Sequence, residues 1–158
     1  RSRMERVVSD IVFDFSVKPR LNNQRGNAIL VASSIYEACK YYELFQKTPF
    51  KGKCAVVTSY NPQTRDITTE DTGANTETDK EFIYNCYTAL LENVDALPGK
   101  TKTESYEDRA KELFKKQPAN MRLLVMSVSV RTLKPRSGLR YPLSAWSLLT
   151  RFAWLTSE

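Results

Sequence analysis

The amino-acid sequence predicts an α/β fold in which a parallel β-sheet is flanked by helices. Residues 28–32 form an apolar run without alternation, which is typical of a strand covered on both faces. Residues 35–45 then repeat apolar side chains at three- and four-residue steps, the period of an amphipathic helix. Residues 53–59 contain a second apolar run. A strand, a helix and a strand in this order usually form a parallel unit with a right-handed crossover.

The remaining elements follow from the same patterns. Apolar residues at helical spacing predict an N-terminal helix, which Pro19 ends. A capping box of Thr78 and Glu81 is expected to start a later helix. Along the chain, the sequence predicts a helix at 4–17, a polar basic connector at 20–25, strands at 28–32 and 53–59, a long exposed loop at 61–78, helices at 78–93 and 105–117, and a buried strand at 121–126.

Two serines lie between the first strand and the central helix. Ser34 and Glu37 have the spacing of a capping box, which places the helix start directly after the strand. Open α/β sheets bind ligands at this edge, and the free N–H groups of a helix N-terminus favour anions such as phosphate. Ser33 and Ser34 are therefore candidate phosphate contacts. The alternative is that they only cap the helix, as serine does routinely.

Composition indicates a single globular domain with a mildly basic character. The chain has 158 residues and a formal net charge of +6. Residues 127–158 hold five of the basic residues and one acidic residue, so the basic excess lies mostly in the tail. No apolar run reaches the length of about 20 residues that spans a bilayer. The three cysteines are scattered through apolar segments, which favours reduced thiols, and the protein is expected to be cytoplasmic.

Several classes of catalytic site are excluded by residues that the chain lacks. It contains no histidine, so no histidine-dependent triad or histidine metal site can form. Neither a phosphate-binding P-loop nor a Gly-x-Gly-x-x-Gly motif occurs. The carboxylates of residues 66–79 have the donor type that hard cations prefer, but a solvated charge run is the expected interpretation. We therefore expect no catalytic residue, no metal and no cofactor bound by this chain alone.

Three stretches resemble a known family. Residues 27–46, 53–60 and 72–79 are similar to the second RecA-like motor domain of the restriction (R) subunit of type I restriction-modification enzymes, especially the IC subgroup, and the resemblance spans residues 4–125. It implies a helicase superfamily 2 translocase that acts on double-stranded DNA and carries an endonuclease. It also implies that the parent enzyme requires ATP and magnesium and assembles with modification and specificity subunits.

The resemblance assigns candidate DNA contacts. Residues 29–34 match the strand and turn of helicase motif IV, which lies beside the DNA backbone, and residues 56–59 match the next strand and its exit loop. This implies DNA-backbone contact by Ser33, Ser34, Thr58 and Ser59. Additional charge contacts are expected from four basic residues, each of which is otherwise a surface cation: Arg25, Lys51, Lys53 and Arg65.

The family pattern is lost after Val125. No Thr-Gly-Phe-Asp-Ala-Pro-like motif V and no arginine-containing motif VI follows. The sequence thus predicts a partial RecA-like motor domain at 1–126 and a divergent basic tail at 127–158, with a short apolar helix at 143–155 that covers a sheet edge or pairs with another copy. A frameshift or a truncated gene is the expected origin of this tail.

The expected function is that of an inactive piece of a motor subunit. In the parent enzyme, a type I site-specific deoxyribonuclease, the domain would grip DNA and close one side of the ATP cleft. By itself it is expected neither to hydrolyse ATP nor to cut DNA. The alternative is a non-enzymatic α/β interaction module that uses its basic tail for oligomerisation or nonspecific nucleic-acid binding.

Overall fold

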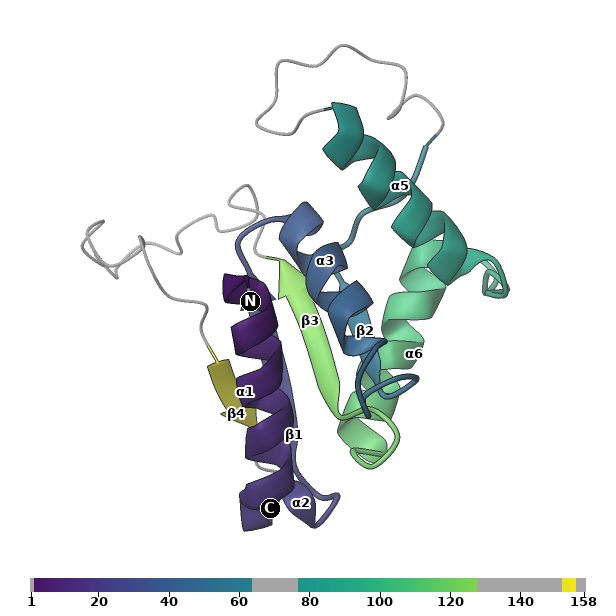
Figure 1. Cartoon of the computed structure of the whole chain (residues 1–158). Helices are drawn as coiled ribbons and strands as arrows, with labels where there is room; N and C mark the ends of the chain where they lie inside the picture. The colour runs from purple at the N-terminus through teal and green to yellow at the C-terminus, as the bar shows by residue number, and fades with distance from the viewer. Residues whose placement is uncertain (1, 64–76, 128–151, 156–158) are drawn as a thin grey trace, which may run out of the picture.

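A computed structural model describes residues 2–63, 77–127 and 152–155 (Figure 1). The described part contains a small β-sheet with helices on both of its faces. No helix in these ranges is both long and apolar enough to cross a membrane. The elements are α1 (Arg3–Val17), α2 (Pro19–Asn22), β1 (Asn27–Ala32), α3 (Ile35–Phe45), β2 (Cys54–Val57), α5 (Glu77–Leu91), α6 (Lys102–Lys116), β3 (Leu123–Ser127) and β4 (Phe152–Leu155).

The sheet has the strand order β2-β3-β1-β4. β3 lies parallel to both of its neighbours, with Leu123 opposite Ala28 of β1 and opposite Cys54 of β2. The predicted parallel sheet is therefore confirmed, but β1 and β2 do not pair with each other because β3 is inserted between them. β4 runs antiparallel to β1, with Trp154 opposite Ala28.

The two faces of the sheet are covered unequally. The larger core joins α1, α2, α3 and α5 to alternate residues of the parallel strands. The smaller core lies on the other face, where Ala110 and Phe114 of α6 pack against residues of β2 and β3. Because all four residues of β2 are buried, that strand is enclosed from both faces, as its unbroken apolar sequence predicts.

Hydrogen bonds and ring contacts connect the amino ends of the parallel strands to the neighbouring helices. Arg122 donates through Nη2 to the carbonyl of Leu21, and its guanidinium lies 4.9 Å from the centroid of the Phe15 ring. Burial lowers the pKa of this guanidinium from its ordinary value. Asn27 donates from Nδ2 to the carbonyl of Phe114 at 2.6 Å, which satisfies an end carbonyl of α6.

The structure corrects three details of the predicted elements. Thr78 lies inside α5 and is not its N-cap, because the helix already includes Glu77. α6 begins three residues before the predicted position, at a capping box formed by Thr101 and Glu104 that the sequence interpretation missed. The predicted helix at 143–155 is wrong over its described part, since residues 152–155 form β4; residues 143–151 lie outside the described ranges. A short apolar run does not by itself distinguish a helix from a strand, and in β4 pairing with β1 decides the outcome.

Candidate functional site: the carboxyl ends of the parallel strands

The end of β1 leads directly into α3 through two serines. Ser34 is the N-cap of α3, and its hydroxyl accepts the backbone N–H of Glu37 at 3.0 Å. The Glu37 carboxylate does not return to Ser34. It accepts instead from the backbone N–H of Ser33 at 2.6 Å and from the Ser33 hydroxyl at 2.5 Å. The predicted capping pair is thus present, but its carboxylate is shifted by one residue toward the strand.

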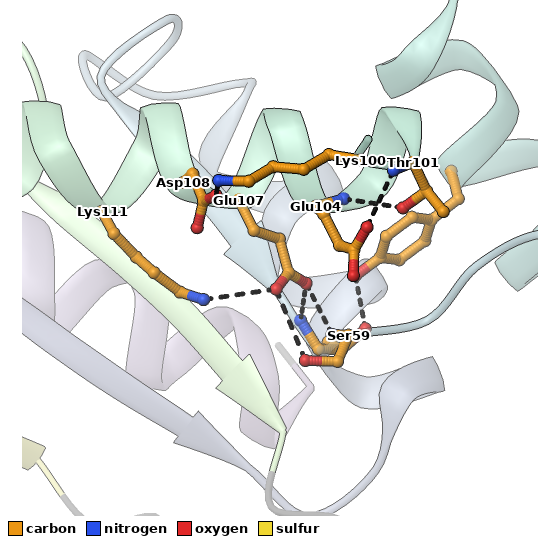
Figure 2. Close-up of polar contacts among 9 residues, drawn as sticks. Ser59, Lys100, Thr101, Glu104, Glu107, Asp108 and Lys111 are labelled. Atoms are coloured by element: carbon orange, nitrogen blue, oxygen red, sulfur yellow. Dashed lines mark hydrogen bonds and ion pairs between the residues drawn. The ribbon is translucent and has the colours of Figure 1, made fainter. Parts of the chain in front are cut away.

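A second carboxylate, that of Glu107, lies at the end of β2 (Figure 2). Glu107, on α6, accepts the backbone N–H groups of Thr58 at 3.1 Å and of Ser59 at 2.5 Å. The other carboxylate oxygen of Glu107, Oε2, lies 3.4 Å from the Ser59 hydroxyl and 3.4 Å from Nζ of Lys111. The Glu107 side chain is only 6% exposed. Two backbone donors and one cation therefore compensate the cost of burying this charge.

Ser59 has an unusual backbone conformation at this turn. Its φ angle is 59°, in the left-handed region that residues other than glycine rarely adopt. This conformation is coupled to two consecutive N–H groups, of Thr58 and Ser59, that converge on one carboxylate oxygen of Glu107. Consecutive N–H groups that converge in this way form an anion-binding concavity. In the folded chain the anion that it holds is Glu107.

Two tyrosines form hydrogen bonds with β2 and the turn that follows it. The hydroxyl of Tyr87, from α5, hydrogen-bonds the hydroxyl of Thr58. The hydroxyl of Tyr106, from α6, accepts the backbone N–H of Val56 at 3.3 Å, which satisfies a donor on the outer edge of the sheet. Burial raises the pKa of both tyrosines above the ordinary range. Both hydroxyls therefore remain protonated at neutral pH.

The four serine and threonine residues predicted as DNA contacts lie at one edge. Ser33 and Ser34 follow β1, Thr58 and Ser59 follow β2, and the end of β3 lies between them. Ser127, at the end of β3, adds a buried hydroxyl oxygen that has no hydrogen-bond partner among the described residues. The amides and hydroxyls of Ser33 and Ser59 are bound by the carboxylates described above.

The predicted basic contacts are not at this edge. Arg25 precedes β1, while Lys51 and Lys53 precede β2. They lie at the opposite edge of the sheet, separated from the serines by the length of β1, roughly 20 Å for six residues. Arg65 lies outside the described residues. The structure thus divides the predicted contacts into two groups that cannot grip the same few phosphates.

A comparison with protein families identifies the chain. The model for type I restriction enzyme subunit R domain 3 matches residues 24–132, more than half of the sequence. The chain belongs to this family. No curated protein and no solved structure matches it.

Membership in the type I R subunit family bears on the predicted division of the chain. The matched region contains β1, α3, β2, α5, α6 and β3, so both serine-containing turns lie inside it. It ends six residues beyond the predicted boundary at 126, which stays a prediction. β4, from the tail, lies outside the match but pairs with β1 inside it. Residues 152–155 of the tail therefore belong to the same sheet as the family domain.

The candidate site presents hydroxyl and backbone N–H groups, which are the donors that an anion such as phosphate accepts from. In the ranges that the structure describes, no group of three or more acidic or cysteine side chains is arranged to hold a metal ion. Of the five carboxylates predicted as a solvated charge run at residues 66–79, three lie outside those ranges. What remains is a row of hydroxyls and N–H groups at the ends of three parallel strands. Those of Ser33 and Ser59 and the N–H of Thr58 are bound by two carboxylates.

Glu107 is the residue that sequence interpretation missed. A signal for it is present, because Thr103, Glu107, Ala110 and Phe114 follow one another at helical spacing and all four are buried. An acidic residue on the buried stripe of a helix requires partners. The sequence predicted this helix without a role for Glu107, and it paired Glu37 with Ser34, whereas the Glu37 carboxylate contacts Ser33.

Proposed function

We propose that this domain acts as the second RecA-like motor domain of a type I restriction enzyme R subunit. In that role it contacts the DNA backbone through the turns after β1 and β2 and forms one side of the ATP cleft. ATP and magnesium belong to the parent enzyme, whose modification and specificity subunits would be its protein partners in the cytoplasm. The observation that carries the proposal is the placement of Ser33, Ser34, Thr58 and Ser59 at one edge, inside the matched family region.

The two carboxylates give this proposal a specific form. Phosphate binding at Ser33 must compete with Glu37, which already occupies its N–H and hydroxyl groups. Glu37 is only partly buried, so it can turn away, whereas Glu107 is held in place by two N–H groups and Lys111. We therefore expect DNA to engage the β1 turn by displacing Glu37 and to approach the β2 turn through the exposed Ser59 side chain.

A matched pair of variants tests this. Glu37→Gln removes the charge that competes with phosphate, while Glu5→Gln removes the same charge from the similar Ser2-to-Glu5 capping box of α1. With the full chain and a labelled DNA duplex, Glu37→Gln should tighten binding several-fold, and Glu5→Gln should change it less than twofold. Fluorescence anisotropy at fixed salt measures both. Equal effects of the two variants would contradict phosphate contact at Ser33.

The interaction module remains a second candidate because β4 of the tail pairs with β1 and so joins the same folded unit. Deleting the tail would also remove this strand, which makes a deletion a poor test. Replacing Arg131, Arg136, Arg140 and Arg151 by glutamine removes tail charge and leaves the β4 sequence unchanged. DNA binding that is lost in this variant and unaffected by Glu37→Gln would favour the interaction module.

A further inference from the structure

The edge of the sheet opposite the serines carries a cluster of exposed cations. We call Arg20, Arg25, Lys51, Lys53 and Lys115 the basic edge. All five are exposed, and among the described residues none of them forms an ion pair. They come from α2, the two segments that precede β1 and β2, and the last turn of α6, which Figure 1 shows at the end of the sheet away from the arrowhead of β3.

Backbone contacts bring these separate segments together. The carbonyl of Lys53 accepts the N–H of Arg122 at 2.8 Å, which joins the start of β2 to the start of β3. Arg122 in turn donates to the carbonyl of Leu21 in α2. A Cβ atom on Gly26 would lie 2.5 Å from the carbonyl oxygen of Arg20, so α2 packs directly against the residue that follows Arg25. The backbone positions of the basic edge are thus fixed by contacts between the segments that carry the cations.

Lys115 is fixed to the same edge from the other face. Its neighbour Phe114 accepts a hydrogen bond from Asn27 at the start of β1, so the last turn of α6 ends beside the segment that holds Arg25. The nearby carboxylates are already used, since Asp14 pairs with Lys18, Glu43 with Lys40 and Lys47, and Glu112 with Lys116. The five cations of the basic edge are left without an acidic partner in the described structure.

We propose that the basic edge is a second binding surface for the phosphate backbone of duplex DNA, separate from the serine-containing turns. Five fixed, unpaired cations match a regularly spaced polyanion. Exposed amide side chains stand among them at Asn22 and Asn23, and such groups commonly contact phosphates. A stable protein partner would instead require an apolar centre. Of the large exposed apolar residues in the described structure, Val17 lies three residues before Arg20, and Phe13 and Leu97 are farther from it in the sequence.

This surface is independent of the proposed motor function. DNA bound at the basic edge lies roughly the length of a strand away from Ser33 and Ser59, as calculated above from the strand rise. The two surfaces therefore contact different stretches of DNA or act at different times. Loss of one should leave the other able to bind.

The test compares two triple variants of the full chain with equal loss of charge. Lys51→Gln, Lys53→Gln and Lys115→Gln remove three cations of the basic edge. Arg6→Gln, Lys102→Gln and Arg109→Gln remove three exposed cations that also lack ion pairs in the described ranges but lie elsewhere on α1 and α6. Far-UV circular dichroism checks that both variants are folded. Anisotropy with a labelled random-sequence duplex is then measured between about 50 and 200 mM salt.

The expected result is a change in salt dependence that follows position and not net charge. Each phosphate contact contributes about 0.9 to the slope of log affinity against log salt, so the basic-edge variant should lose roughly 3 units of slope and at least tenfold in affinity at the lower salt. The control variant should change the slope by less than about 1 unit. This outcome must hold in the presence of Glu37→Gln, which separates it from the serine-containing turns.

Three results would overturn the proposal. Equal weakening in both triple variants would mean that net charge alone attracts DNA. Unchanged binding in the basic-edge variant, together with loss of binding when the four tail arginines are replaced, would place the DNA contact in the tail. Binding of the unsubstituted chain to vesicles of anionic phospholipid, with no measurable binding to DNA, would assign the surface to a membrane and not to nucleic acid.

Discussion

The two edges of the parallel sheet use charge in opposite ways. At the carboxyl edge, the carboxylates of Glu37 and Glu107 already bind the N–H groups of Ser33, Thr58 and Ser59 and the hydroxyl of Ser33. At the amino edge, five exposed cations have no ion-pair partner in the described structure. The carboxyl edge thus contains carboxylates that occupy its donors, whereas the cations of the amino edge have no carboxylate paired with them in the described structure.

This difference shows why residue type alone does not locate a DNA contact. Serines after a strand have the right chemistry for phosphate, yet the affinity they provide depends on the carboxylate that must first leave. Lysines that precede a strand have no distinguishing sequence pattern, and only the tertiary structure shows that they lie at the same edge of the sheet. Under the proposed DNA contacts, the carboxyl edge would make contacts that form and release, and the amino edge would supply a salt-dependent, sequence-independent attraction.

Alkaline pH should have the largest effect, because it should unfold both edges together. Burial raises the pKa of Tyr42 and of Cys54 to about 12 and raises those of Tyr87 and Tyr106 as well. Since the folded state favours the protonated forms, their contribution to stability is complete below the ordinary values of 9.0 for the thiol and 10.0 for the tyrosines. It is lost as the pH rises above these values toward the folded pKa values.

We therefore expect cooperative unfolding as the pH rises from about 10 to 12, with tyrosinate absorbance appearing in the same transition as the loss of circular dichroism. The hydroxyls of Tyr87 and Tyr106, which hold Thr58 and Val56, must ionise for this transition to complete. Tyrosines that ionise well before the circular dichroism changes would contradict burial of these groups.

Glu107→Ala should have the next largest effect. It leaves the N–H groups of Thr58 and Ser59 without an acceptor and Lys111 without its partner, at a cost of about 3 kcal/mol in the free energy of unfolding. Glu107→Gln keeps one acceptor oxygen and should cost about 1 kcal/mol. Urea unfolding followed by circular dichroism distinguishes them. Similar small losses for both variants would mean that Glu107 is not needed to hold this turn.

The sequence predicted the architecture better than the contacts at the edges. The unbroken apolar runs at β1, β2 and β3 required burial on both faces, so the parallel sheet followed from local pattern. Its strand order did not, because nothing in a strand's own sequence states that β3 lies between β1 and β2. The same holds for β4, whose four residues form a strand only through pairing with β1.

The candidate site was predicted in part for a related reason. The helix start at Ser34 was predicted correctly because a helix start has a local signature, and the DNA contacts of Ser33 and Ser34 stay a prediction. The contact between Glu107 and Ser59 joins residues 48 positions apart, and the basic edge joins residues from four segments. Such contacts depend on tertiary packing, which local patterns do not encode. Only the buried position of Glu107 on the α6 stripe gave a sequence-level indication of it.

The smallest expected effect concerns one strained residue at each edge. Gln24 and Ser59 have φ angles of 64° and 59°, a conformation that glycine adopts more easily. At each position the glycine variant should therefore be about 0.5 kcal/mol more stable than the alanine variant, because relief of left-handed strain slightly exceeds the entropy cost of glycine. Denaturant unfolding of the four variants measures this difference. If the gain is larger at Ser59 and disappears when Glu107→Ala is added, the carboxylate enforces the strained turn; equal gains that persist would mean that the turn is strained by the chain alone.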